Sequence, residues 1–188
     1  SNSACELWGQ GFLEQDTFGR RNDLLHRAVE LDQRVLCYTT KAFMTPFLEK
    51  NGRRLNFAAA EIKNDKNMVS IAVRQDATAL EFASKELRRD PFLTTLAAVK
   101  RNGMALENAA AGFKSEKTIV LTAVKRNWKA LNFASEDLKD DEDVVLAAVE
   151  QNGWALQYAS AKLKDRKKVV LIAVTDNWRV IEQASERL

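Results

Sequence analysis

The chain is poor in the residues on which catalytic and metal-binding sites most often depend. Its 188 residues include a single histidine, His26, and two cysteines, Cys5 and Cys37. Two cysteines cannot build a disulfide framework, and neither has a partner at the spacing of metal ligands. The sequence also lacks a glycine-rich phosphate loop and a hydrolase nucleophile motif. We therefore expect a reducing compartment of the cytoplasmic type, and no enzyme activity, cofactor or metal ion.

Two groups of residues still offer catalytic or metal-binding alternatives. His26 and Cys37, with a nearby acid, could form a cysteine nucleophile and its base. Cys37, however, lies in the apolar segment VLCY, which is typical of a buried and inert thiol. The acidic run from Asp140 to Asp143 has neither the ligand spacing nor the glycine turn of a calcium loop. Its place before an apolar segment favours a role of these acids at the start of a helix.

Long apolar runs and breakers of regular structure are scarce as well. The longest runs, Val144 to Val149 and Val169 to Val174, are far too short for a transmembrane helix. The first residues contain no apolar region of a signal peptide, although export without a cleaved signal remains an alternative. Seven glycines and two prolines indicate mostly regular structure, and a net charge of +3 does not by itself indicate nucleic-acid binding.

What the sequence does contain is a repeat. One leucine position recurs every 25 residues, with a single step of 26 where an extra residue lies near Asp90 and Pro91. A fixed period of this length predicts an array of stacked units rather than one globular core. Such arrays usually act as binding surfaces. The recurring positions are Leu55, Leu80, Leu106, Leu131, Leu156 and, with isoleucine, Ile181.

Each unit is expected to form two antiparallel helices. The first is apolar almost throughout, as in TIVLTAV, and the second is amphipathic, as in WALQYASAKL. An Asn or Asp between them (51, 76, 102, 127, 152, 177) should close the first helix in the left-handed conformation and cap the second. The residues expected to cap the first helix are Asn64, Asp90, Ser115, Asp140 and Asp165.

Small residues also recur and should allow close packing of helices. The residue after the corner alternates between glycine and tryptophan in the last four units, which suggests a double unit of about fifty residues. The alanines expected to share one position of the first helix are Ala72, Ala98, Ala123, Ala148 and Ala173.

The pattern decays towards the N-terminus. Pro46 should interrupt the helix that leads into Asn51, and residues 22–36 form one further amphipathic pattern. We therefore predict an N-terminal helical cap over residues 1–49 and a six-unit array over residues 50–188, in a fragment of a longer protein. The predicted fold is an all-α solenoid of short antiparallel helix pairs.

A basic column marks the end of the first helix in the earlier units. Stacked units bring equivalent positions together, so these cations should form a stripe that binds an acidic partner: a protein, an anionic lipid headgroup or a nucleic acid. The alternative is that cations simply favour helix C-termini. The residues are Lys50, Arg74, Lys100, Arg101, Lys125 and Arg126.

The tryptophans divide into two groups. Trp128 and Trp178 lie three positions before the core residues Leu131 and Ile181, which predicts packing in the core. Trp154 lies two positions before its core leucine and should point away. It is either an anchor for a partner or a cover for the neighbouring unit.

The motif AVxxNGxALxxAS, found from Ala148 to Ser160 with variants in the other units, resembles a known family. It is the uncharacterised tandem-repeat family called domain of unknown function 4116, and the resemblance covers roughly residues 50–188. The family implies no activity, cofactor or catalytic residue. Its repeats occur in proteins that intracellular bacterial pathogens inject into host cells, so the resemblance implies an effector or a part of one.

These observations predict a non-enzymatic protein-interaction scaffold, part of a secreted bacterial effector that binds a host protein. The basic stripe and Trp154 are the predicted contacts. One alternative is binding of nucleic acid or another anionic surface by the stripe. Another is a repeat region that positions a catalytic domain outside this chain.

Overall fold

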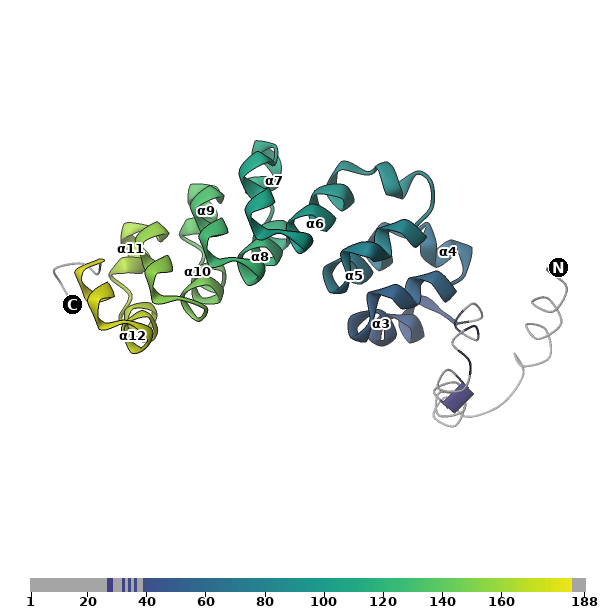
Figure 1. Cartoon of the computed structure of the whole chain (residues 1–188), viewed down its shortest axis with the longest axis horizontal. Helices are drawn as coiled ribbons and strands as arrows, with labels where there is room; N and C mark the ends of the chain where they lie inside the picture. The colour runs from purple at the N-terminus through teal and green to yellow at the C-terminus, as the bar shows by residue number, and fades with distance from the viewer. Residues whose placement is uncertain (1–26, 29–31, 33, 35, 37–38, 184–188) are drawn as a thin grey trace, which may run out of the picture. The chain divides into compact units, whose positions relative to one another are not determined.

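The computed structural model describes residues 27–28, 32, 34, 36 and 39–183. All regular structure in this part is helical, and it repeats along the chain as an all-α solenoid (Figure 1). Most of the predicted N-terminal cap, with His26 and both cysteines, lies outside the described residues. The described array begins with a helix at Lys41, before the predicted boundary at residue 50.

Each repeat that the structure describes in full contains three short helices instead of two, and two helices of the last repeat lie within the described residues. The first α-helices are α3 (Lys41–Lys50), α5 (Lys66–Gln75), α6 (Pro91–Arg101), α8 (Lys117–Arg126), α10 (Glu142–Val149) and α12 (Lys167–Asp176). A 3₁₀ helix follows each: η2 (Gly52–Phe57), η3 (Ala77–Phe82), η5 (Gly103–Asn108), η6 (Trp128–Phe133), η7 (Gly153–Tyr158) and η8 (Trp178–Gln183). The third helices are α4 (Ala60–Lys63), η4 (Leu87–Arg89), α7 (Ala111–Lys114), α9 (Glu136–Lys139) and α11 (Ala161–Lys164).

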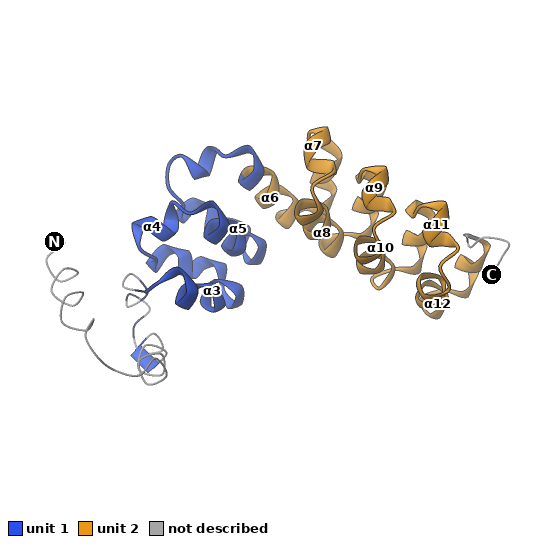
Figure 2. Ribbon diagram, turned by 180° about the vertical axis from the view of Figure 1, so that it is seen from behind, with its two compact units in different colours: residues 1–93 blue, residues 94–188 orange. Residues whose placement is uncertain are grey.

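The chain divides into two compact units, residues 1–93 and residues 94–188 (Figure 2). In unit 1, α3 packs against α5, and η2 packs against η3. In unit 2, α8 packs against α10, and α10 against α12, with the 3₁₀ helices alongside. Helix α6 crosses the boundary between the units.

The corner residues act as predicted at both helices, but with a different backbone. Asn127 donates its N–H to the Ala123 carbonyl at 2.9 Å, and its side chain accepts from the Lys129 N–H at 3.0 Å. The six corner residues have φ between −138° and −161°. The expected left-handed conformation is therefore wrong. An extended residue already turns the chain, because a 3₁₀ helix starts directly after it.

The predicted second helix is wrong as a continuous element. Ala159 and Ser160 are extended and separate η7 from α11. The Ala159 N–H bonds to the Leu156 carbonyl at 3.1 Å, and the Ser160 hydroxyl accepts from the Leu163 N–H at 3.2 Å. Serine competes for backbone donors in this way and favours a helix start over a helix interior. Leu156 and Leu163 remain buried although they lie on separate helices.

In four first helices the N-cap position lies one residue after the predicted cap; Asp65 and Asp141 cap with their side chains there, whereas Glu116 and Arg166 do not. Asp90 accepts from the Leu93 N–H at 3.0 Å, as expected for a cap. The other predicted caps instead end the preceding short helix: Asn64, Ser115, Asp140 and Asp165. The residues that precede the first helices are Asp65, Glu116, Asp141 and Arg166.

Helix α3 continues through Pro46, so the predicted interruption is wrong. Proline in a helix interior removes one backbone hydrogen bond. Burial of Met44, Phe47 and Leu48 on the inner face offsets this loss.

Small residues set the distance between repeats. A Cβ atom on Gly52, Gly103 or Gly153 would lie 2.1–2.4 Å from a carbonyl oxygen of the next first helix. These glycines recur about every fifty residues, which confirms the double unit. Among the predicted alanines, Ala98 in α6 is exposed, and the expectation of burial is wrong there. The fully buried ones are Ala72, Ala123, Ala148 and Ala173.

Candidate binding surface

Lysines in the first turn of the first helices form ion pairs between repeats. Lys66 pairs with Asp90 at 2.8 Å and Lys117 with Asp141 at 2.7 Å. In each pair the lysine opens one helix and the aspartate precedes the first helix of the next repeat, 24 residues later. We call this set of pairs, with Lys41–Asp65, the first-turn edge.

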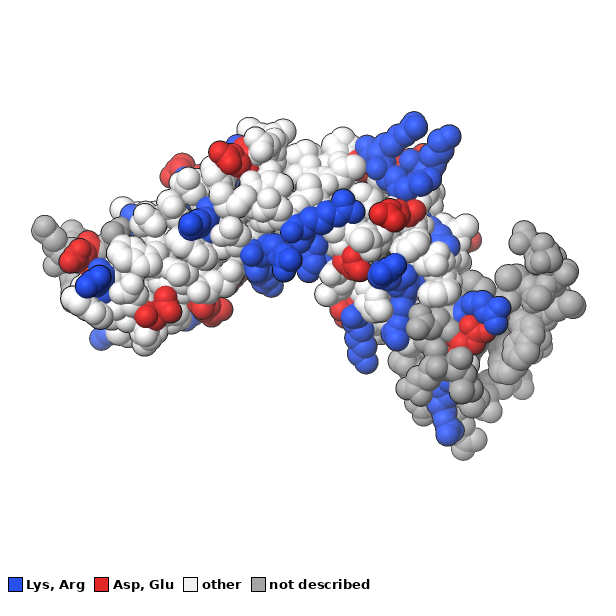
Figure 3. Space-filling model, viewed as in Figure 1, with Lys and Arg blue, Asp and Glu red and all other residues white. Residues whose placement is uncertain are grey.

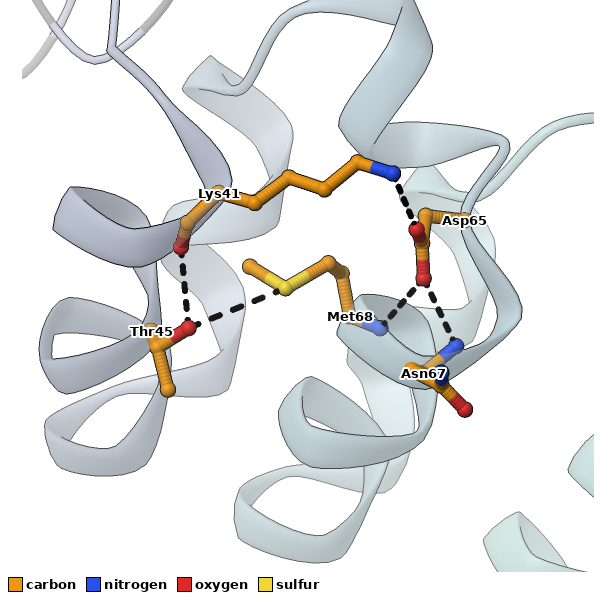
Figure 4. A network of polar contacts seen from close by, with 5 residues as sticks. All are labelled: Lys41, Thr45, Asp65, Asn67 and Met68. Atoms are coloured by element: carbon orange, nitrogen blue, oxygen red, sulfur yellow. Dashed lines mark hydrogen bonds and ion pairs between the residues drawn. The ribbon is translucent and has the colours of Figure 1, made fainter.

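The environment of Asp65 shows what such a pair does (Figure 4). One carboxylate oxygen accepts from Lys41, and the other accepts from the N–H groups of Asn67 at 2.9 Å and Met68 at 3.1 Å. The hydrogen bond from Lys41 is the main reason that the pKa of Asp65 lies below its ordinary value. One aspartate thus caps its own helix and joins it to the preceding repeat.

The other paired aspartates behave similarly. Burial alone would raise the pKa of Asp141, but hydrogen bonds from Lys117 and from the Val144 N–H outweigh it and lower that pKa. The pKa of Asp90 is lowered against burial in the same way by Lys66 and the Leu93 N–H. Sequence reasoning missed this edge. The recurrence of Lys and Asp at a separation of 24 was the available signal.

The six predicted cations lie in the last turns of four first helices, a set that we call the last-turn edge. Lys50 ends α3, and Arg74 is the penultimate residue of α5. The last two residues of α6 are Lys100 and Arg101, and those of α8 are Lys125 and Arg126. Lys100 is half-buried and the other five are exposed.

Within unit 2 the structure brings two of these helix ends together. A Cβ atom on Gly103, two residues after Arg101, would lie 3.0 Å from the backbone nitrogen of Asn127, which follows Arg126. Lysine and arginine side chains gather over α6 and α8 in Figure 3. In unit 1, Lys50 and Arg74 belong to helices that pack side by side. Each unit therefore carries its own group of last-turn cations.

The last-turn cations differ from the first-turn lysines in their partners. Within residues 39–183, none of the six forms an ion pair. Cations in the last turn are stabilised by the helix C-terminus itself. Their charges are therefore not neutralised by an acid of the same chain in the described part.

The switch away from basic residues in the last two repeats has a structural reason. Gln151, equivalent to Arg126, donates to the carbonyl oxygens of Val124 at 2.7 Å and Ala147 at 2.9 Å. Asp176, one repeat later, accepts from the Gly153 N–H at 2.9 Å. At this end of the array the column binds neighbouring repeats together, which sequence reasoning did not detect.

The tryptophans only partly follow the predictions. Trp154 is half-buried, on a 3₁₀ helix. Trp128 is half-buried and its ring centroid lies 6.2 Å from that of Tyr158 in the following repeat. Trp178 is 68% exposed and Ile181 is 55% exposed, so their predicted place in the core is wrong. In the described part of the chain, no following repeat covers η8 as Tyr158 covers Trp128.

Other site classes are not apparent in the described residues. In that part no cluster of histidine, cysteine and acidic residues could hold a metal ion. No helix among the described residues has the length and apolar character to cross a membrane. An open hollow of about 250 Å³ in unit 1 is lined by Lys85, Arg88 and Arg89, none of which is an ordinary nucleophile.

A protein-family model matches most of the array. The model described as "Domain of unknown function (DUF4116)" matches three successive segments, residues 40–88, 95–139 and 141–188. Each segment spans about two of the 25-residue repeats, in agreement with the spacing of the buried glycines. Comparison with curated proteins and with solved structures found no match. The chain belongs to the DUF4116 family of tandem repeats.

Proposed function

We propose that this chain is a non-enzymatic protein-interaction scaffold that binds an acidic surface of its partner through the last-turn edge. The observation that carries the proposal is the group formed by Lys100, Arg101, Lys125 and Arg126 in unit 2. These cations lie at two neighbouring helix ends, and within the described residues none forms an ion pair.

The last-turn cations contrast with the first-turn lysines. Lys66 and Lys117 form ion pairs with aspartates of the next repeat. Cations in a last turn need no such partner, because the carbonyl groups of the helix end already favour them. Their charge stays directed at solvent, where it can accelerate encounter with an acidic partner and reject a basic one.

Lys50 and Arg74 provide a smaller group of the same kind in unit 1. Trp154 is half-buried and offers part of its ring as an apolar contact in unit 2. Aromatic side chains at a contact contribute strongly to binding.

The proposed setting is a bacterial effector, delivered without a cleaved signal into the reducing interior of a host cell, with a host protein as partner. This part rests on the resemblance of the repeats to those of effector proteins. Repeat arrays commonly supply extended binding surfaces, which supports the scaffold role.

Charge reversal tests the proposal directly. We expect the variant to lose retention on a glutamate homopolymer and capture of the host partner, while its circular dichroism stays helical. A control with the same change in net charge reverses exposed cations of unit 1 and should retain both activities. Unchanged retention and capture by the test variant would contradict the proposal. The test substitutions are Lys100→Glu, Arg101→Glu, Lys125→Glu and Arg126→Glu; the control substitutions are Arg53→Glu, Lys85→Glu, Arg88→Glu and Arg89→Glu.

The same proteins distinguish a protein partner from a nucleic acid. Neutralisation of four phosphates by these cations would give a slope of about −4 in a plot of log affinity against log salt for duplex DNA. A gel shift of random DNA or RNA with such a slope, abolished by the test substitutions, would favour nucleic acid over protein as the partner.

A further inference from the structure

We propose that the exposed end of unit 2 is a docking face for one more unit of this repeat, stacked in the register of the array. The face consists of Leu171, Trp178 and Ile181, which belong to α12 and η8. They are 55%, 68% and 55% exposed and are the large apolar side chains that the described part leaves most open to solvent.

Equivalent side chains in the two preceding repeats are buried or half-buried; Leu121 and Leu146, at the position of Leu171, are half-buried. Leu131 and Leu156, at the position of Ile181, are 0% exposed. Trp128, at the position of Trp178, is half-buried against Tyr158. The cover comes each time from the next repeat, since η6 packs against α10 and η7, and η7 packs against α12 and η8. The preceding repeats therefore show the chemistry of a matching cover: an apolar first helix followed by a 3₁₀ helix.

An independent observation comes from the first-turn edge. Lys41, Lys66 and Lys117 each open a first helix and pair with the aspartate that precedes the next one. Lys167 opens α12 in the same way and is exposed. It forms no ion pair within the described residues. The occupant should therefore bring an aspartate to the residue before its first helix.

The apolar face alone is too small to favour a second copy of the chain. A standard interface takes roughly 800 Å² from each partner. Three partly exposed side chains fall well short of this area. A repeat unit supplies both the apolar cover and the acid.

The test adds a unit to the full chain. A copy of residues 139–163 is placed directly after Leu188, the position equivalent to Leu138 and Leu163. The copied Asp141 then follows Lys167 by 24 residues, the separation of the lysine–aspartate pairs. The copied Tyr158 follows Trp178 at the same separation as Tyr158 follows Trp128.

Hydrogen exchange followed by mass spectrometry gives the main readout. We expect the amides of residues 171–183 to exchange at least tenfold more slowly, an order of magnitude set by the cooperativity of stacked repeats. The matched control carries Val144→Asp and Val145→Asp in the copy only, and should leave exchange as in the original chain. Lys167→Ala should reduce the added protection in the extended chain and leave the original chain unchanged.

Two results would overturn the proposal. The first is unchanged exchange of residues 171–183 both with this copy and with a copy of residues 63–87, which places Asp65 at the same position and is used in case the first does not fold. The second is a dimer of the original chain in sedimentation, abolished by Trp178→Ser and Ile181→Ser. That result would show that the face binds a second copy of the chain.

Discussion

The two ends of the first helices carry similar cations in different electrostatic situations. At the start of a helix, Lys66 and Lys117 lie against the positive end of the helix dipole, which disfavours them. An aspartate from the next repeat offsets this in both cases. At the end of a helix, Arg101 and Arg126 lie against the negative end and need no acid.

This difference indicates that cohesion between repeats and recognition of a partner can depend on different ends of the same helices. Charges at the first-turn edge form ion pairs between repeats, so substitutions there should weaken the packing of one repeat on the next. Charges at the last-turn edge are held by their own helix, so substitutions there should change binding and leave the stack intact. The free energies of unfolding of variants at the two edges test this contrast.

The largest effect is expected in the core that both edges share. Leu131 on η6 is fully buried, and Leu131→Ala should lower the free energy of unfolding by about 2–5 kcal/mol, because it leaves a cavity between repeats. Urea denaturation measures this. Leu171→Ala makes the same chemical change at a side chain that is 55% exposed, and it should cost less than about 0.5 kcal/mol. Equal losses for the two variants would contradict the assigned core.

The next effect concerns the distance between repeats. Gly103→Ala places a Cβ atom 2.4 Å from the Ala123 carbonyl oxygen, and the forced shift should cost about 1–3 kcal/mol. Gly112→Ala is the matched control, because a Cβ atom there meets nothing within 4 Å. Alanine should stabilise α7 at that position by roughly 0.5–1 kcal/mol. Thermal unfolding should therefore move in opposite directions for the two variants, and a shift in the same direction would be inconsistent with close packing at Gly103.

Sequence reasoning was most successful where one residue type has one structural use. The period and the helical class follow from repeated apolar positions, which tertiary packing preserves. At the recurring leucine position, Leu55, Leu106, Leu131 and Leu156 are buried and Leu80 is half-buried. The corner residue Asn127 was correctly predicted to serve two helices, because its backbone ends α8 and its side chain caps η6.

Sequence reasoning failed where two adjacent residues could serve the same role, and where burial depends on contact with another repeat. Asp140 and Asp141 are both good caps, and only the folded chain shows that Asp141 is the one used. The leucines at 156 and 163 fit one α-helix as well as two short helices, so the break at Ala159 stayed hidden. Burial of Ile181 was inferred from equivalent leucines, although its burial depends on a cover that the described part does not provide.

For the candidate site, the sequence identified the last-turn cations but not whether each of them forms an ion pair. A basic column is visible in the residues, yet whether each cation has an acid beside it depends on the stacking of repeats. The pairing of Lys117 with Asp141 and the lack of an ion pair at Arg126, within the described part, are therefore structural findings.

A smaller effect separates capping from pairing at the first-turn edge. Asp141→Ala removes the cap of α10 and one of the two acids paired with Lys117, the other being Asp143, and should cost about 0.5–2 kcal/mol. Asp141→Asn keeps a side chain that caps equally well and removes only the charge, so its loss in urea denaturation should be smaller. Equal losses would mean that the ion pair, and not the cap, dominates at this position.

Acid should weaken the same edge. Because the pKa of Asp141 is lowered in the folded chain from an ordinary value of 3.8, the unfolded chain binds the proton more readily. The stability that this aspartate contributes is complete above its unfolded pKa and is lost as the pH falls through its folded pKa. Denaturation between pH 6 and 3 should show stability falling below about pH 4, with a shallower fall in Asp141→Asn. Parallel curves for the two proteins would contradict the assigned coupling.

The smallest effect is expected at the last-turn edge, where Lys125→Ala and Arg126→Ala are the informative changes. Each should alter the free energy of unfolding by no more than about 0.5 kcal/mol, since exposed surface substitutions seldom exceed that size. Both side chains are exposed, so retention on the glutamate homopolymer should fall although stability does not. If instead Arg126→Ala destabilises the chain as much as Asp141→Ala, the last-turn cations hold the repeats together as the first-turn lysines do. The separation of cohesion from recognition would then be wrong.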